Sequence, residues 1–358
     1  MCLERVIILK RIKKIMISLI AWTVINVLFV TVYAAPFEMQ NAIKPNIQMY
    51  SSSSNIVDTG KCGEDLIWTL YEDGLLSITG TGDMYDYTLN SKPWENYKNN
   101  ITTLVLDEGI TSIGDYAFFD CNKITGNLTI PDSVTSIGSC AFAYCSGFTG
   151  SLTISDSVTS IEGSAFYDCS GFTGSLTISD GVTSIGDYVF ANCSSFTGSL
   201  TIPDSVTSIG YRAFQRCSGL TGSLTIPNGV TSIGDDAFRN CKGFTGRLVI
   251  PQNVKTIGEE AFMHCINLQD NIIIPENVVF IGKNAFFNCK GITDVNIAKK
   301  KDSISGSPWG LITNNQAVIH WANPSDTAYK INIISPGDVE YNAAGKTTPD
   351  VVITDTER

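Results

Sequence analysis

A 24-residue repeat constrains the fold of this chain more strongly than any other feature of its sequence. Four apolar positions return in register eight times. Isoleucine, phenylalanine and cysteine positions follow nine, fourteen and seventeen residues after a leucine position, which is occupied by Leu104, Leu128, Leu152, Leu176, Leu200, Leu224, Leu248 and Ile272. A unit this short cannot bury its own apolar side chains, so successive units stack on one another and form a solenoid.

Each repeat is predicted to contain one short strand and one helical turn. Residues 152–154 alternate apolar, polar and apolar, which is typical of a strand with Thr153 pointing outward, and residues 155–157 then turn the chain. Residues 163–169 are compact enough for a single helical turn that directs Phe166 and Cys169 inward. The predicted fold is therefore an α/β solenoid of about eight coils over residues 104–297.

The segments on either side of the repeats are predicted to cap the solenoid. Residues 61–103 contain two alternating runs around Asp73 and Gly74, the pattern of a β-hairpin, and we expect this module to cover the first coil. After residue 297 the period fades, and residues 298–323 are expected to form a C-terminal cap. Residues 324–358 resemble the opening strands of an immunoglobulin-like domain, which predicts a partial domain of this kind or a flexible tail.

The repeat motif carries a family resemblance. Leu-x-Ile-Pro-x-x-Val-x-x-Ile-Gly-x-x-Ala-Phe-x-x-Cys, as in residues 200–217, resembles the BspA-like leucine-rich repeat of bacterial and protist surface proteins, the Treponema pallidum type. The resemblance covers residues 104–297, and its departures include Glu162 in place of glycine and Val189 in place of alanine. It implies a leucine-rich-repeat solenoid that adheres to host or matrix macromolecules at the cell surface.

The first 34 residues have the layout of a signal peptide. Five basic residues precede an uncharged run over residues 15–33, and Val32 and Ala34 supply the small residues of a cleavage site. The run is also long enough to span a bilayer as an uncleaved anchor, which is the alternative. We expect a secreted or cell-surface protein, with residues 35–60 as a flexible linker.

Charge and histidine content exclude several classes of function. The formal net charge is −11, and without residues 1–34 the chain keeps 19 of its 24 basic residues and 34 of its 35 acidic residues. This excess argues against a nucleic-acid partner, which needs a basic face. Only His264 and His320 occur, and no nucleophile, phosphate-loop or zinc motif is recognisable. We therefore predict no enzymatic activity, no metal and no cofactor.

The eight cysteines of the repeat are predicted to be buried thiols. Their spacing provides none of the paired, short-range ligands of a zinc site, and free cysteine is commonly a small core residue. Disulfides between neighbouring coils are the alternative, because export favours oxidation. Cys62 and Cys140 lie outside the repeated position and are expected to be more reactive than the repeated cysteines, although a plain thiol is the favoured interpretation there too.

Two further groups of polar residues are candidates for a binding site. One aspartate per coil recurs at Asp132, Asp156, Asp180 and Asp204, and stacked carboxylates could hold Ca²⁺. An aspartate in such a turn usually accepts a hydrogen bond from its own backbone, and we expect that role here. His264 lies at a variable position and is expected to be an ordinary surface residue.

A column of outward residues on the predicted strands is the candidate binding face. It consists of Thr129, Thr153, Thr177, Thr201, Thr225, Val249 and Ile273. It is expected to be the only broad face with equivalent positions from every coil, so variable turn residues such as Tyr211 and Arg212 should matter less. A flat face of low charge suits many weak contacts with a protein or a glycan. The alternative is that threonine merely favours exposed strand positions.

The sequence as a whole favours an exported binding or adhesion module. Its expected partner is a protein or glycan on a host or matrix surface, and membrane contact is expected only through residues 1–34 if they remain uncleaved. The alternatives are a structural spacer that presents another domain, or the non-catalytic repeat part of a longer cell-wall-associated protein.

Overall fold

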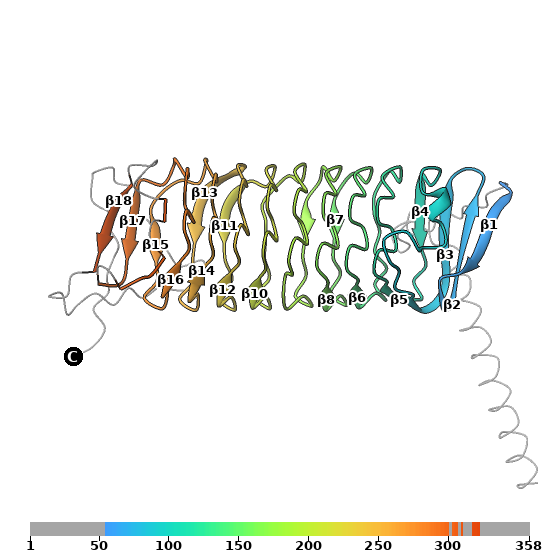
Figure 1. Ribbon diagram of the computed structural model, residues 1–358, viewed down its shortest axis with the longest axis horizontal. Helices are drawn as coiled ribbons and strands as arrows, with labels where there is room; N and C mark the ends of the chain where they lie inside the picture. Colours follow the sequence, from blue (N-terminus) through green and yellow to red (C-terminus); the bar gives the residue numbers. More distant parts are fainter. Residues whose placement is uncertain (1–53, 301–302, 307–308, 311–316, 323–358) are drawn as a thin grey trace, which may run out of the picture. The chain divides into compact units, whose positions relative to one another are not determined.

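The computed structural model describes residues 54–300, 303–306, 309–310 and 317–322. The expected signal segment, most of the expected linker and the expected immunoglobulin-like segment lie outside the described residues. Within the described part, the chain winds through successive coils that carry two rows of strands, as Figure 1 shows. The solenoid predicted from the repeat is confirmed.

The first row of strands begins at the repeated leucine position. Residues 24 apart pair in parallel, so Leu152 lies opposite Leu176 and Leu224 lies opposite Leu248. The row contains β4 (Thr103–Leu106), β7 (Leu152–Thr153), β9 (Leu176–Thr177), β11 (Gly222–Thr225), β13 (Phe244–Val249), β15 (Ile272–Ile274), β17 (Asp294–Ile297) and β18 (Val318–Trp321). The leucine side chains point into the core and the following residue points outward, as the alternation predicts.

A second row of strands, not foreseen from the sequence, ends at the repeated isoleucine position. Its members are β5 (Ile110–Ile113), β6 (Ser136–Ile137), β8 (Ser160–Ile161), β10 (Ser208–Ile209), β12 (Ser232–Ile233), β14 (Thr256–Ile257) and β16 (Phe280–Ile281). They also pair in parallel at a spacing of one repeat, with Ile137 opposite Ile161. Most are two residues long, too short for the alternation that identifies a strand in a sequence.

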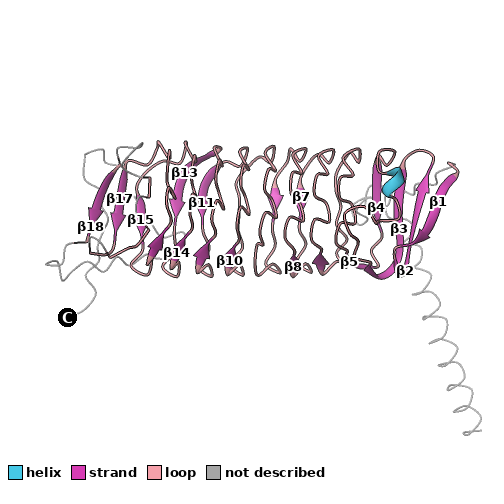
Figure 2. Ribbon diagram, in the orientation of Figure 1, coloured by secondary structure: helices cyan, strands magenta, loops and turns pink. Residues whose placement is uncertain are grey.

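The helical turn predicted at residues 163–169 is absent, and the segment is instead a run of tight turns. Figure 2 shows loops and turns here in every coil, and the only helix in the described residues is the 3₁₀ helix η1 (Glu95–Tyr97). Ser164 and Asp168 have φ of 60° and 56°, in the left-handed region that a right-handed helix does not contain. The N–H of Phe166 donates to the carbonyl oxygen of Val189 in the next coil, at 3.0 Å. Hydrogen bonds between coils therefore alternate with local turn bonds, such as that from the N–H of Tyr167 to the carbonyl oxygen of Ser164 at 3.0 Å.

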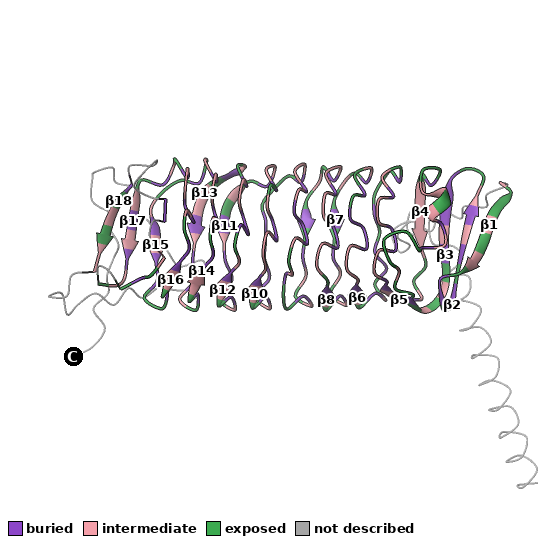
Figure 3. Cartoon of the chain, viewed as in Figure 1, coloured by how far each residue is buried: buried purple, intermediate pink, exposed green. Residues whose placement is uncertain are grey.

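The core between the two rows is a stack of aromatic rings. Consecutive rings of the repeated phenylalanine position lie 5.2–5.7 Å apart between centroids and within 20° of parallel. Trp94 continues the stack before the first repeat, 5.6 Å from Phe118. Figure 3 shows buried stretches returning in successive coils of the stack, whereas β4 and β18 contain no buried residue. Each ring thus packs mainly on its neighbours one coil away.

The N-terminal module is the predicted hairpin with one additional strand. β2 (Gly63–Tyr71) and β3 (Leu75–Met84) pair antiparallel around Asp73 and Gly74, and Gly74 has φ of 85°, which glycine adopts at little cost. β1 (Ile56–Lys61) pairs antiparallel with β2, so residues 56–60 are strand and not the expected linker. β3 also pairs in parallel with β4 and β5 and so supplies the first coil with a neighbour in both rows.

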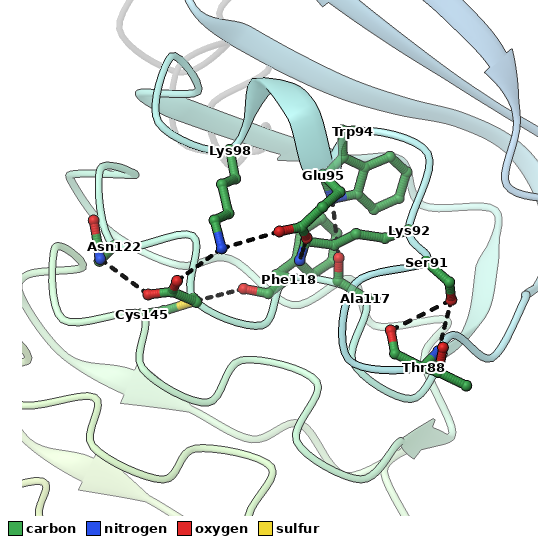
Figure 4. A network of polar contacts seen from close by, with 11 residues as sticks. Thr88, Ser91, Lys92, Trp94, Glu95, Lys98, Ala117, Phe118, Asn122 and Cys145 are labelled. Carbon is green, nitrogen blue, oxygen red and sulfur yellow. Dashed lines mark hydrogen bonds and ion pairs between the residues drawn. The ribbon is translucent and has the colours of Figure 1, made fainter.

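Polar contacts fasten this module to the first repeats (Figure 4). The indole N–H of Trp94 donates to the carbonyl oxygen of Ala117 at 2.9 Å, and the ring itself is fully buried. The Lys98 ammonium lies 3.0 Å from Glu95 and 2.9 Å from Asp120, which belongs to the first repeat. The module therefore acts as a cap for the first coil, as predicted.

The C-terminal cap is one more coil whose sequence no longer shows the repeat. Asn296 lies opposite His320 in the β17–β18 pair, at the usual spacing of one repeat. The N–H of Ile281 donates to Ser305 at 3.1 Å, and the buried Trp309 lies 5.9 Å from Trp321 between ring centroids. The backbone therefore still pairs at a spacing of 24 residues after residue 297, although the side chains no longer follow the repeat motif.

Candidate binding surfaces

The predicted binding face lies on the outer side of the first row of strands. Four of its threonines are exposed, and Thr225, Val249 and Ile273 are half-buried. The positions are in register from coil to coil, because Thr153 lies opposite Thr177, Thr177 opposite Thr201, and Thr225 opposite Val249. We call the seven predicted residues the first-row column: Thr129, Thr153, Thr177, Thr201, Thr225, Val249 and Ile273.

A second repeated column lies outside the second row of strands, so the first-row column is not the only broad repetitive face. This second-row column contains Thr111, Thr135, Thr159, Thr183, Thr207, Thr231, Lys255 and Val279, of which all but Thr111 are exposed. Its hydroxyls take part in the stacking of the coils. Thr135 donates to the carbonyl oxygen of Thr111 at 3.1 Å, and Thr207 donates to that of Thr183 at 3.2 Å.

The threonine hydroxyls of the first-row column do not make hydrogen bonds to neighbouring coils of the described chain. Within the described part of the chain, none of Thr129, Thr153, Thr177, Thr201 and Thr225 makes a side-chain hydrogen bond. The two columns therefore share a residue type but differ in the hydrogen bonds that its hydroxyl makes. In the second-row column threonine supports the coil stack, whereas in the first-row column its hydroxyl is available to a ligand.

The repeated cysteines are buried thiols, as predicted. All eight are free and fully buried. From Cys145 onward, each thiol donates to the carbonyl oxygen of the phenylalanine of the preceding coil; Cys193, for example, donates to Phe166 at 3.1 Å. Burial raises the pKa of Cys289 to about 12, so this thiol stays protonated and poorly nucleophilic at neutral pH.

Cys62 does not behave as expected. It is fully buried in the N-terminal module, and this burial raises its pKa to about 12, so the expectation of a reactive thiol is wrong. It lies between β1 and β2, and its own N–H donates to the carbonyl oxygen of Leu66 at 3.0 Å. Cys140 is partly exposed and is the accessible thiol among the described cysteines.

The acidic residues considered as a cation site do not form one. Asp132, Asp156, Asp180 and Asp204 are all exposed, and none makes the expected hydrogen bond to its own backbone within the described residues. Residues 54–300 and the short described stretches after them contain no cluster of three or more His, Cys, Asp or Glu side chains placed to hold a metal ion.

An acidic hollow lies where the N-terminal module meets the first repeats. Asp83, Asp86, Asp115 and Glu162 line it. Each carboxylate accepts a hydrogen bond from its own chain: Asp115, for example, accepts from the N–H of Ser139 at 2.6 Å. Three of these bonds link neighbouring segments of the stack, whereas the bond from Ser160 to Glu162 lies within one coil.

His264 is half-buried and not a simple surface residue. Its Nδ1 lies 2.7 Å from the side-chain nitrogen of Asn288, and its ring meets the edge of Phe287 at 5.8 Å between centroids. Burial, together with the nearby Arg239, lowers the pKa of His264, so the ring is mostly neutral at pH 7. It helps to stack neighbouring turns.

An aromatic stripe crosses the turn face, which is formed by the tight turns around the repeated phenylalanine. Neighbouring rings lie 5.0–6.0 Å apart between centroids, mostly edge to face, and the stripe consists of Tyr116, Phe119, Tyr144, Tyr167, Tyr188 and Tyr211. Its members occupy different positions in different coils, so a comparison of equivalent positions does not reveal it. The signal that could have done so is the enrichment of tyrosine around the phenylalanine position in the first five repeats.

The described part of the chain contains no helix that is both long and apolar enough to cross a bilayer.

Comparisons with known proteins support the repeat assignment. The model of the BspA type leucine rich repeat region matches residues 89–221 and 183–310, with six copies. No curated protein matches the chain significantly. Among solved structures, the chain is similar to a leucine-rich repeat protein from Eubacterium ventriosum, with 23% identity, a TM-score of 0.46, and coverage of 74% of this chain and 78% of that one.

Two further solved structures show a similar level of likeness. A leucine-rich cell surface protein from Faecalibacterium prausnitzii is 23% identical, with a TM-score of 0.36, over 75% of this chain and 96% of that one. The leucine-rich repeat protein of Treponema pallidum is 23% identical, with a TM-score of 0.38, over 65% of this chain and 90% of that one. Since the family match spans well over half of the sequence, the chain belongs to the BspA-type leucine-rich repeat family.

Proposed function

We propose that this protein is an exported binding or adhesion module that recognises a protein or glycan on a host or matrix surface. Export is inferred from the signal-like residues 1–34, and recognition is assigned to the first-row column. The fold supports a binding role because stacked repeats present a broad, continuous face built from equivalent positions. No catalytic role is assigned to any residue.

The observation that carries the proposal is the state of the threonine hydroxyls in the first-row column. They are exposed or half-buried, spaced one coil apart, and have no hydrogen-bond partner in the described chain. The second-row column shows that threonine in this solenoid can use its hydroxyl for stacking. A role in stacking the coils therefore explains the recurrence of threonine in the second-row column better than in the first-row column.

The surroundings of the first-row column favour an uncharged ligand surface. The residue two positions before each threonine also points outward. In the first five coils of this column this residue is uncharged and polar: Asn127, Ser151, Ser175, Ser199 and Ser223. Ser175 uses its hydroxyl and its N–H to contact the Ser151 hydroxyl, at 3.2 and 3.1 Å. A lattice of neutral hydroxyls suits a partner that offers many hydrogen-bonding groups, and weak contacts repeated on each coil gain from effective concentration.

Changing three neighbouring threonines should test this face. The triple variant Thr153→Lys, Thr177→Lys and Thr201→Lys places bulky charges on a neutral surface, and we expect at least tenfold weaker binding to whichever matrix protein or cell-surface glycan the wild type binds. A milder triple variant with valine removes only the hydroxyls and should keep the melting temperature, because Val249 already occupies this column. Losing three ligand hydrogen bonds of about 0.5–1.5 kcal/mol each should weaken binding at least tenfold as well.

The matched control carries lysine at Thr183, Thr231 and Val279 of the second-row column, whose side chains make no hydrogen bond within the described chain. Lys255 shows that this column accepts lysine, so the control changes the net charge equally on another face. It should bind nearly as well as the wild type. If the wild type binds no member of a panel of matrix proteins and glycans, or if the first-row variants bind as well as the control, the proposal fails and the spacer takes its place.

A further inference from the structure

We propose that the aromatic stripe on the turn face binds a basic segment of a partner protein, through cation–π contacts with Lys or Arg side chains. This surface is separate from the first-row column, so the inference goes beyond the proposed function. It rests on the placement of tyrosines in turns that do not require them, on a cation already bound at one end of the stripe, and on the charge of the surrounding coils.

The backbone positions of three stripe residues are unfavourable for tyrosine. Tyr116, Tyr144 and Tyr188 have φ of 53°, 63° and 59°, in the left-handed region that suits Asn, Asp and Gly far better than a bulky residue. At the position of Tyr144, other coils carry Asn192, Asn240 and Asn288 with φ of 64°, 62° and 59°. The left-handed φ belongs to the turn, because Ser164 and Asp168 share it, so the turn itself does not require tyrosine and the rings need another explanation.

One end of the stripe already holds a cation. The Arg212 guanidinium carbon lies 4.6 Å from the ring centroid of Tyr211 and 5.6 Å from that of Tyr188. Arg212 also donates to the Tyr188 hydroxyl at 3.2 Å and to the Asp236 carboxylate at 3.0 Å. Ring face, phenol oxygen and carboxylate together thus form a guanidinium site within the chain, and such contacts are attractive.

The rest of the stripe has rings and carboxylates but no such cation. Between Lys123 and Arg212 the chain contains no Lys or Arg, whereas it contains seven acidic residues: Asp132, Asp156, Glu162, Asp168, Asp180, Asp187 and Asp204. Asp168 follows Tyr167 directly, and it occupies in the next coil the position that Tyr144 occupies in its own. In the described chain Asp168 makes no side-chain hydrogen bond or ion pair, and it is half-buried.

Tyr144, Tyr167 and Asp168 therefore offer the same kinds of group as the Arg212 site, namely two rings packed edge to face and a carboxylate, without a cation of the described chain among them. Tyr144 is 40% exposed, so an incoming side chain can reach its ring. A neutral glycan could stack on these rings, but it would make no use of the unpaired carboxylate or of the acidic surroundings. Charge complementarity favours a Lys- or Arg-bearing segment.

The test uses the full chain and a synthetic hexa-arginine peptide, with binding measured by isothermal titration calorimetry at low salt. Hexaglutamate and cellohexaose serve as acidic and neutral comparison ligands. Tyr144→Asn removes a ring without changing the net charge and introduces the residue that other coils carry at this position. We expect this variant to stay folded and to bind hexa-arginine roughly three- to thirtyfold more weakly, the range of one cation–π contact.

Tyr144→Phe is the matched control, because it keeps the ring and should bind within about twofold of the wild type. Equal binding by the wild type and Tyr144→Asn would mean that general charge attraction holds the peptide, and it would overturn the proposal. Stronger binding of cellohexaose than of hexa-arginine would overturn it in favour of a glycan. The valine triple variant of the first-row column should bind the peptide normally, so failure here is distinguishable from failure of the proposed function.

Discussion

Phe190→Ala is expected to lower the free energy of unfolding by about 3–5 kcal/mol. Phe190 is fully buried and lies between Phe166 and Phe214, with centroids 5.7 and 5.5 Å away. The substitution removes apolar burial and two ring contacts, and it leaves a cavity in the middle of the stack. In a solenoid each coil is held by its neighbours, so the coils on both sides should loosen together.

Chemical denaturation followed by circular dichroism gives the loss, and native-state hydrogen exchange shows which coils open. Phe190→Leu is the control, because it refills most of the volume and should destabilise by less than half as much as alanine. A small loss for Phe190→Ala, equal to that of the leucine control, would mean that this position is not core.

Gly210→Ala is expected to destabilise the protein by about 1–3 kcal/mol, whereas Gly186→Ala should have little effect. A Cβ on Gly210 would lie 2.7 Å from the carbonyl carbon of Gly186 and 2.8 Å from the backbone nitrogen of Asp187, both in the preceding coil. Backbone atoms cannot move aside as a side chain can, so the two coils must separate. Thermal unfolding of the two variants measures the difference.

The matched control is built into the repeat. A Cβ on Gly186 would meet nothing closer than 3.6 Å, and the preceding coil carries Glu162 where most coils have glycine. The coils therefore stand further apart at this one step, and alanine there should be neutral or stabilise slightly by restricting the unfolded chain. Similar losses of stability at both glycines would contradict the explanation that glycine recurs at this position because neighbouring backbones approach closely there.

The parts of the fold that were predictable are those in which one residue type returns at one position. The repeated leucine, phenylalanine and cysteine positions all point inward, and the hairpin around Asp73 and Gly74 follows its turn sequence. The tight turns were misread as helical because Ala165, Phe166 and Cys169 have helical spacing. The sequence does not show that Ser164 and Asp168 take left-handed φ values, which break such a helix.

The coil after residue 297 was not predictable from the repeat motif. Its backbone still pairs at the spacing of one repeat, since hydrogen bonds between coils involve main-chain groups that every residue has. Its side chains differ because they cover an end of the stack and not another identical coil. A repeat search that depends on side chains therefore stops before the backbone repeat does.

The candidate surfaces were only partly predictable. The outward direction of Thr153 follows from strand alternation, but only the folded structure shows that its hydroxyl has no partner in the described chain. The burial of Cys62 depends on its place in the core of the folded N-terminal module, which its position in the sequence does not reveal. The aromatic stripe joins Tyr144 to Tyr167 across coils from different positions of the repeat, so it exists only in the folded stack.

Removal of whole repeats tests most directly whether binding depends on the repetitive face. Excision of residues 151–222 deletes three repeats and joins Gly150 to Ser223, which restores the local sequence Thr-Gly-Ser-Leu of the intact chain. We expect the shortened protein to fold with the same circular dichroism spectrum. Its affinity for the partner of the wild type should fall by more than the proportion of coils lost, because repeated contacts act through effective concentration. A folded variant that binds its partner as tightly as the intact chain would contradict recognition by the first-row column.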